Sequence, residues 1–291
     1  MSAHQNVFAP LTMDFMFKRA FGTEKNKHIL ISLINTFMGR KMKYPVEDVI
    51  LINTVQTPKT EELRGAVFDL HCQDTQGNRF IVEMQLAKQM HFLERIIFYI
   101  SQAIVGAAEK GSGYDYSLPR IYVLCFLDFV PIDIGDIGEG DDESVQYISL
   151  SNEKHPEIRY PYINIAFAIL PKFTKTDSQC ETLLDWWLFL FKNMPELGEV
   201  PPELLKLSEN TFQDLFEAAK IAKLSREELM WYDLEMKRKR DAYAVMQCAI
   251  HDGMEQGRAK GMEEVLALVE EGYSPAEIRN LLAKDNVSSL V

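Results

Sequence analysis

The sequence is poor in the residues from which disulfide frameworks and clustered metal sites are built. It has 4 cysteines and 6 histidines among 291 residues. No Cys-x-x-Cys or His-x-x-x-His spacing occurs. The cysteines are therefore typical of small buried apolar residues in a reducing compartment, and neither a disulfide framework nor a zinc site is indicated.

Long apolar stretches are also missing. The longest unbroken apolar run covers residues 121–127, far below the roughly 18 residues that a membrane span requires. The first ten residues lack the basic flank and the apolar stretch of a signal peptide. These absences predict a cytoplasmic protein with no membrane partner.

Positive charge is scarce overall but not locally. The chain has 43 Asp and Glu against 31 Lys and Arg, a net charge of -12, which argues against a protein that coats nucleic acid. Residues 1–45 nevertheless hold seven Lys or Arg against two carboxylates, a local charge of +5. Residues 128–143 hold seven carboxylates, three glycines and no Lys or Arg. That segment is predicted to be a loop, either solvated or cation-binding, and its spacing fits no calcium loop, which favours the solvated alternative.

The remaining composition is that of a globular protein. Hydrophobic residues make up 47% and charged residues 25%, close to ordinary averages, so the chain can bury enough apolar surface to fold. At roughly 100–200 residues per domain, the length predicts one large domain with an appendage, or two domains.

Apolar periodicity predicts an α/β core followed by a mostly helical extension. The elements of the first 130 residues follow the order α-β-β-β-α-β, and from residue 178 the pattern is helical. We therefore place one domain at residues 1–175 and the extension at residues 176–291. The predicted helices cover residues 12–22, 27–38, 89–110, 178–193, 202–222, 226–271 and 275–283, and the predicted strands cover residues 49–54, 66–73, 79–86, 120–127, 147–150 and 164–170.

The longest predicted helix contains glycines at four-residue spacing. Gly253, Gly257 and Gly261 each cost about 1 kcal/mol relative to alanine inside a helix. Close approach of a second helix, as in a homo-oligomer, and a poorly packed helix explain them equally well.

Two predicted strands on either side of a turn each carry one apolar face and one face with a carboxylate. Asp69 lies opposite the apolar face of the first strand, and Glu83 lies opposite that of the second. If the apolar faces coincide in the sheet, the carboxylates coincide as well. The apolar faces consist of Phe68, Leu70 and Cys72 in the first strand and of Phe80, Val82, Met84 and Leu86 in the second.

The chemistry of the turn selects the register of these strands. A loop of two or four residues would place Asp69 on the face opposite Glu83. A three-residue loop over residues 75–77 places the two carboxylates side by side. Such loops usually end in a residue of left-handed conformation, for which Gly77 is suited.

Adjacent carboxylates repel each other, and either a raised pKa or a bound cation relieves the repulsion. Mg²⁺ takes one or two carboxylates together with waters and phosphate oxygens, and it can polarise a phosphodiester and lower the pKa of a bound water. On the evidence of the two strands alone, a solvent-facing pair without a ligand is favoured, because alternating polar faces are common.

Several short motifs follow one another over the first 175 residues, each weak alone but fairly specific in this order. They are Asp14-Phe15-Met16-Phe17-Lys18, Phe21-Gly22, Leu33-Ile34-Asn35, Phe68-Asp69-Leu70, Ile81-Val82-Glu83-Met84-Gln85, Arg95 with Tyr99, and Leu170-Pro171-Lys172-Phe173. With this combination the sequence resembles the PD-(D/E)XK nuclease superfamily, and more closely its Rpn-like family of recombination-promoting nucleases and transposase-like proteins.

The resemblance implies a restriction-endonuclease-like core, a central mixed sheet flanked by helices, with a helical C-terminal extension. It also implies that Asp69 and Glu83 bind Mg²⁺ or Mn²⁺ and that the backbone carbonyl of Met84 adds a ligand. Gln85 stands where the superfamily has lysine, and an amide has no charge with which to help deprotonate water. The same glutamine resembles a variant seen across the family.

Only the resemblance assigns further residues to the candidate site. Lys18 or Lys88 could supply the missing cation and contact DNA. Asp14 could be a further metal ligand or a helix N-cap. Arg95 and Tyr99, four residues apart on a helix, could contact phosphate or form a packing pair.

Three functions are compatible with these residues. The leading one is a Mg²⁺-dependent DNA endonuclease of the recombination-promoting type, with DNA as its partner. The second is a catalytically weak or inactive DNA-binding or oligomeric regulator that keeps the nuclease fold. The third is a protein-interaction scaffold built on the helical tail.

Overall fold

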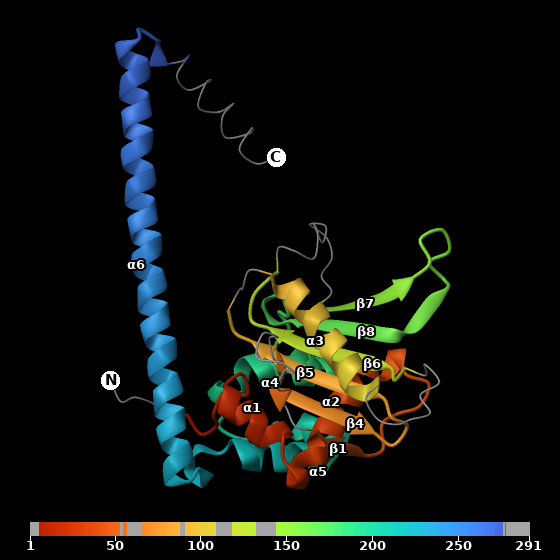
Figure 1. Ribbon diagram of the computed structural model, residues 1–291. Coiled ribbons are helices and arrows are strands. Elements are labelled where there is room, and N and C mark those ends of the chain that lie inside the picture. Colours follow the sequence, from red (N-terminus) through yellow and green to blue (C-terminus); the bar gives the residue numbers. More distant parts are fainter. Residues whose placement is uncertain are drawn as a thin grey trace. The chain divides into compact units, whose positions relative to one another are not determined.

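The computed structural model of the protein describes residues 6–52, 55–56, 66–87, 91–108, 118–131, 144–275 and 277 (Figure 1). The chain divides into two compact units, residues 1–231 and residues 232–291. Most of the predicted acidic loop, residues 132–143, and most of the predicted last helix lie outside the described residues. Among the helices described, none is long and apolar enough to cross a membrane.

The first unit is built on a six-stranded mixed sheet with the strand order β1-β4-β5-β6-β8-β7. The neighbours β5, β6 and β8 run parallel, and the other neighbours run antiparallel. All residues of β6 are buried between two parallel strands, as its unbroken apolar sequence predicts. The strands of the sheet are β1 (Val49–Leu51), β4 (Leu70–Asp74), β5 (Arg79–Gln85), β6 (Ile121–Leu127), β7 (Val145–Ser151) and β8 (Arg159–Ile169), and a separate pair is formed by β2 (Val55–Gln56) and β3 (Ala66–Val67).

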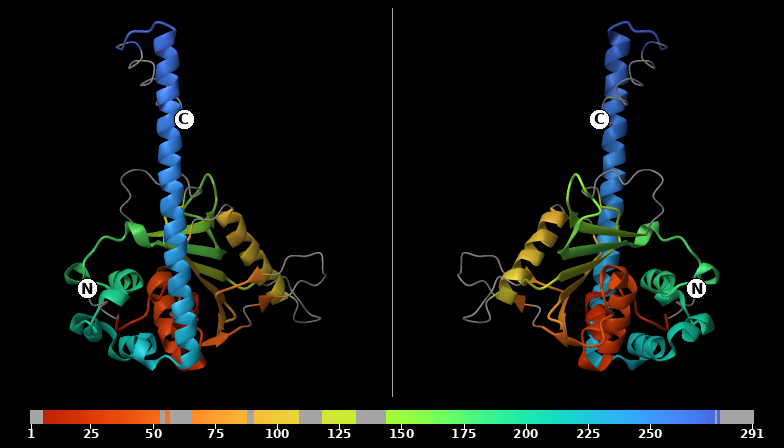
Figure 2. Two further views of the ribbon diagram at one scale, coloured as in Figure 1. Left: turned by 90° about the vertical axis from the view of Figure 1, so that its left-hand side faces the viewer. Right: turned by 90° about the vertical axis from the view of Figure 1, so that its right-hand side faces the viewer.

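Helices cover both faces of this sheet (Figure 2). On one face α3 (Phe92–Ala108) buries Ile96 and Ile100 against Val123 and Phe167. On the other face Phe126 stacks on Phe191, with ring centroids 4.0 Å apart. Each helix therefore covers apolar sheet surface with its own apolar stripe. The helices of the second face are α1 (Asp14–Phe21), α2 (Lys27–Met38) and α4 (Leu183–Asn193), with α5 (Pro202–Ala219) packed on them.

The predicted strand over residues 66–73 is interrupted in the structure. β3 ends at Val67 and pairs with β2, whereas β4 begins at Leu70 in the main sheet. Strict alternation predicted that Phe68 shares a face with Leu70 and Cys72, and this prediction is wrong. It packs instead against Tyr99 of α3, with ring centroids 5.1 Å apart, because the break at Phe68 and Asp69 resets the two-residue period.

The sheet unit continues past the boundary that the sequence placed after residue 175. Trp187 of α4 packs against Phe21 of α1 and Phe212 of α5, with ring centroids 5.9 and 5.0 Å apart. Helices α4 and α5 thus share the core of the sheet unit, and the division between the compact units falls after Trp231. Helical periodicity identifies such helices but does not tell which core they join.

Helix α6 (Arg226–Glu270) is one continuous helix of 45 residues, and none of its residues is buried. A Cβ added at Gly253, Gly257 or Gly261 would meet no atom within 4 Å. Nothing in the described chain therefore requires glycine at these three positions.

Candidate active site

The hairpin formed by β4 and β5 has the register that its turn predicts. Leu70 lies opposite Val82 and Gln73 lies opposite Arg79. The three-residue loop ends at Gly77, whose φ is +84°. Continuing the same register brings Asp69 beside Glu83, so this prediction is confirmed.

Asp69 and Glu83 are joined by hydrogen bonds between side chain and backbone. The backbone N–H of Asp69 donates to Oε1 of Glu83 over 3.1 Å. The backbone N–H of Met84 donates to Oδ2 of Asp69 over 2.8 Å. Because β4 starts only at Leu70, carboxylate oxygens accept these N–H groups where the strand ladder has ended. The bonds hold both carboxylates at the carboxyl end of β5.

Burial makes the charge on this pair costly. Glu83 is only 2% exposed, and desolvation together with the nearby charge of Asp69 raises its pKa to about 8. Desolvation also raises the pKa of Asp69, with a smaller contribution from Asp14. A buried and a half-buried carboxylate that repel each other favour a proton or a cation between them.

Gln85 and Arg95 form a chain of hydrogen bonds that ends on Glu83. Nη2 of Arg95 donates to Oε1 of Gln85 over 2.5 Å, and Nε2 of Gln85 donates to Oε2 of Glu83 over 3.3 Å. The amide of Gln85 is thereby oriented with its nitrogen toward the carboxylates. Arg95 acts on the site through Gln85, and its positive charge favours the ionised form of Glu83.

Tyr99 lies in the same electrostatic environment, one helical turn beyond Arg95. The guanidinium of Arg95 is 5.9 Å from the centre of the Tyr99 ring. Burial raises the pKa of the Tyr99 phenol, and the charge of Glu83 adds to the rise. Arg95 and Tyr99 therefore do face the carboxylates. Phe68, which the sequence placed on the opposite face, supports the Tyr99 ring, and strict alternation could not have identified it.

The N-terminal helix brings Lys18 and Asp14 toward the site. Nζ of Lys18 lies 2.8 Å from Oδ1 of Asp14. Burial lowers the pKa of Lys18, but its hydrogen bond to Asp14 and the nearby negative charges together outweigh burial and raise it. The charges of Asp69 and Glu83 raise it further, so the ammonium of Lys18 belongs to the electrostatics of the pair.

Asp14 does not take the second role that the sequence allowed, that of an N-cap. Met13 is the N-cap of α1, and Asp14 is the first residue of the helix. Across the described ranges no group of three or more His, Cys, Asp or Glu side chains is placed to hold a metal ion, so Asp14 does not complete a three-carboxylate cluster. Lys88 lies outside the described residues.

The donor set nevertheless fits a hard divalent cation. Asp69 and Glu83 offer carboxylate oxygens that lie close together, and the backbone carbonyl of Met84 lies on the same strand. Magnesium sites commonly use one or two carboxylates and complete the shell with waters and phosphate oxygens. A set of two carboxylates is therefore sufficient.

A mixed sheet covered by helices on both faces, with two carboxylates on a β-hairpin, is the arrangement that the resemblance to the PD-(D/E)XK nuclease superfamily implied. The family model of the PD-(D/E)XK nuclease family transposases matches residues 11–249, and the chain belongs to this family. The match includes α4 and α5, which the structure also places in the sheet unit. No curated protein and no solved structure matches the chain.

Proposed function

We propose that this protein is a metal-dependent DNA endonuclease of the recombination-promoting type, acting in the cytoplasm. The observation that supports this best is the pair of carboxylates formed by the buried Glu83 and the half-buried Asp69, joined across the hairpin by two hydrogen bonds. A fold that only needed stability would gain by replacing a buried like-charged pair with apolar residues.

Asp69, Glu83 and the Met84 carbonyl would hold Mg²⁺ or Mn²⁺. When bound, the cation would polarise the scissile phosphodiester and lower the pKa of an attacking water. Arg95 holds the Gln85 amide toward Glu83, so Gln85 can orient a water by hydrogen bonding although it cannot take its proton. Lys18 supplies the positive charge that the superfamily's lysine would supply, and Lys18, Arg95 and Tyr99 are the candidate contacts to DNA phosphate.

The test is nicking of supercoiled plasmid at low salt with Mg²⁺, Mn²⁺ or EDTA. We expect Asp69→Asn and Glu83→Gln each to lower the metal-dependent nicking rate at least about 100-fold, with circular dichroism unchanged. Glu94→Gln is the matched control, because Glu94 is an exposed carboxylate on α3, next to Arg95. Undiminished nicking in both site variants, or equal nicking in EDTA, would refute the proposal.

The second candidate function is a DNA-binding regulator that does not cleave. Gln85 favours it, because an amide has no ionisable proton for general acid–base catalysis. In this case the wild-type chain would retain DNA in a salt-sensitive manner and cleave it with neither metal. The same plasmid samples, assayed for retention as well as nicking, separate the two functions.

We also propose that the chain self-associates through α6. An exposed apolar face follows the alternating spacing of three and four residues that is typical of paired helices, and it consists of Tyr243, Met246 and Ile250 followed by Gly253 and Gly257. In an antiparallel pair with its dyad between residues 251 and 252, Met246 and Ile250 would lie opposite Gly257 and Gly253. The same arrangement would set Lys239 and Arg240 against Glu264 and Glu263, whereas a parallel pair would set the basic residues 237–240 against themselves.

Sedimentation of the full chain over a range of concentrations tests this assembly. Met246→Glu should shift a dimer to monomer. Val245→Glu should not, because Val245 is exposed but lies about a quarter turn away from the face. A wild-type monomer at all concentrations, or a dimer that survives Met246→Glu, would contradict the proposal.

A further inference from the structure

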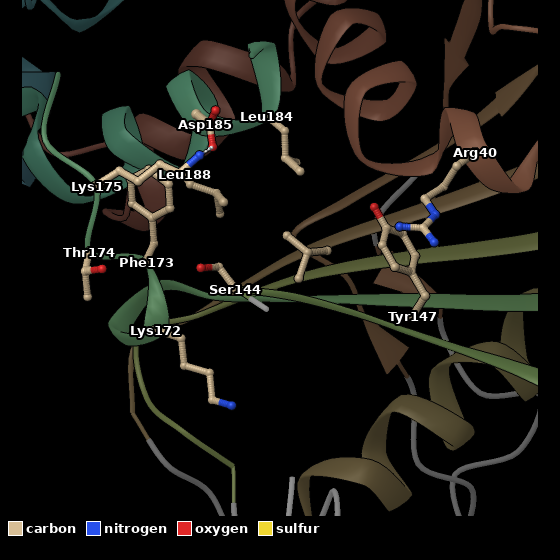
Figure 3. A pocket seen from close by; sticks show the side chains of 11 residues that line it. Arg40, Ser144, Tyr147, Lys172, Phe173, Thr174, Lys175, Leu184, Asp185 and Leu188 are labelled. Carbon is tan, nitrogen blue, oxygen red and sulfur yellow. Dashed lines mark hydrogen bonds and ion pairs between the residues drawn. The ribbon is translucent and has the colours of Figure 1, made fainter. Parts of the chain in front are cut away.

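A cavity of about 400 Å³ lies on the sheet face opposite α3, between the start of β7, helix α4 and the segment after β8 (Figure 3). Val145 and Tyr147 of its wall pair with Ala168 and Ala166 of β8, whose neighbours Phe167 and Ile169 point to the α3 side. The cavity shares no residue with the Asp69–Glu83 site. It is lined by Arg40, Ser144, Val145, Tyr147, Lys172, Phe173, Thr174, Lys175, Leu184, Asp185 and Leu188.

The charge of this cavity is opposite to that of the chain. Three cationic side chains line it against one carboxylate, Asp185. That carboxylate is already neutralised, because Lys175 Nζ lies 2.7 Å from Asp185 Oδ1, and the N–H and hydroxyl of Thr182 donate to Asp185 Oδ2. Arg40 therefore offers a positive charge that no carboxylate of the cavity's lining balances, in a protein whose net charge is -12, and this favours an anionic ligand.

Further cations surround Arg40. Burial lowers the pKa of the Lys41 ammonium, and the positive charges of Arg159 and Arg40 lower it further. Within the part of the chain that the structure describes, none of these three side chains forms an ion pair with a carboxylate. Like charges therefore lie close together with no counter-ion among the described residues, and an anion that binds here relieves their repulsion.

Arg40 is held in place for such an anion. Its guanidinium carbon lies 4.4 Å from the centre of the Tyr147 ring, and the Tyr147 hydroxyl donates to the backbone oxygen of Phe37 over 2.8 Å. Stacking uses the flat face of the guanidinium and leaves its N–H edge for a phosphate, which it can bind in a bidentate manner. Figure 3 shows Arg40 and Tyr147 side by side at one end of the cavity.

The opposite end of the cavity combines apolar side chains with the ion pair of Lys175 and Asp185 (Figure 3). Leu184 and Leu188 of α4 and the Phe173 ring line the cavity, and the hydroxyl-bearing Ser144 and Thr174 also belong to its lining (Figure 3). Its volume falls within the range of pockets that take small organic ligands. A ligand that fits both ends carries a phosphate at one end and a flat, largely uncharged group with a few hydrogen-bonding atoms at the other.

We propose that this cavity binds a nucleotide, with its phosphate on Arg40 and its base against Leu184 and Leu188. The nucleotide could be free or could be the phosphorylated end of a DNA strand, since both present the same chemistry. The site does not depend on the Asp69–Glu83 pair, so it stands whether or not the protein cleaves DNA.

The probe is deoxyadenosine monophosphate, titrated calorimetrically into the full-length chain, with adenosine and inorganic phosphate in parallel. We expect Arg40→Gln to weaken binding of the monophosphate by about tenfold or more. Lys43→Gln is the matched control, because Lys43 is an exposed cation that packs on Tyr44 outside the cavity. Glu83→Gln should also leave binding unchanged, which separates this proposal from the endonuclease.

Competition distinguishes the two sources of the nucleotide. Displacement of the monophosphate by a 5′-phosphorylated oligonucleotide, but not by its 5′-hydroxyl form, identifies a strand end; no displacement by either identifies a free nucleotide. Both results support the proposal. Equal binding by the Arg40→Gln variant overturns it, and so does equal affinity for inorganic phosphate, which would leave only an anion site, or for adenosine, which would leave only an apolar one.

Discussion

In the sheet unit, carboxylates are buried beside aromatic side chains, whereas in α6 beyond Trp231 apolar side chains are exposed among charges. Glu83 is 2% exposed, while Met254 is 70% exposed. Folding of the isolated chain explains neither placement, because burying charge and exposing apolar surface both cost free energy. This difference is what the two proposals would explain: a cation bound at the carboxylates of the sheet unit, and a second copy of the chain packed against the apolar face of α6.

The largest effect should come from the aromatic core of the sheet unit. Phe126 is fully buried and contacts Phe37 and Phe191, so Phe126→Ala should lower the free energy of unfolding by about 3–5 kcal/mol. Met254→Ala, the matched change in α6, should alter it by less than about 0.5 kcal/mol. Urea unfolding measures both, and similar losses would mean that α6 is packed after all.

The buried pair predicts an unusual pH dependence. The pKa of Glu83 is about 8 in the folded protein against 4.5 ordinarily, so between these values the folded state binds a proton that the unfolded chain has released. The free energy of unfolding should therefore fall as pH rises through this window, and the raised pKa of Asp69 acts in the same direction.

Glu83→Gln removes the main source of this slope. At pH 8 the variant should be more stable than the wild type by on the order of a few kcal/mol, and thermal unfolding across pH 4.5–8 measures it. Mg²⁺ should stabilise the wild type at pH 8 but not the variant. Glu199→Gln, at an exposed glutamate, is the control, and a wild-type profile without the slope would contradict the prediction.

Substitution of Arg95 in the sheet unit should have an effect of intermediate size. Because Arg95 orients the Gln85 amide, Arg95→Gln should lower the rate of nicking by roughly 10–100-fold, chiefly in kcat, with little change in thermal stability. Arg95→Lys should restore part of the rate, since it keeps the charge but not the planar fork. If Arg95 and Tyr99 were only a packing pair, stability would change and the rate would not.

The smallest effect concerns the glycines of α6. Gly257→Ala should raise helix stability by about 1 kcal/mol, because a Cβ there meets no atom of the same chain. If the glycines admit a second copy, the same methyl group should weaken self-association. Circular dichroism and sedimentation are needed together, and an unchanged oligomeric state would leave the glycines as marks of a poorly packed helix.

Much of the fold could be predicted because it depends on local periodicity. The stripe on α2 and the apolar run of β6 specify their elements whatever the chain does elsewhere, and the carboxylate register follows from Gly77 and the loop length. The break at Phe68 could not be predicted, because strand alternation carries no signal for where a strand leaves one sheet for another. The same limit applies to α4 and α5, because packing and not periodicity decides which core these helices join.

The basic cavity is the feature that could least be predicted from the sequence. Arg40 follows α2, Tyr147 lies on β7 and Lys172 follows β8, so no local pattern joins them. The sequence did show a positive N-terminal region of +5, but not where its charges would gather.

By itself the sequence determined which residues are candidates for a site and that Asp69 and Glu83 would meet, because a hairpin's turn and its two-residue period are local properties. Only the tertiary structure decided how deeply the pair is buried, that Arg95 holds Gln85, and that Arg40 and Lys172 share a cavity. Burial and electrostatic coupling depend on which distant segments pack together, and that choice is made by the whole core at once.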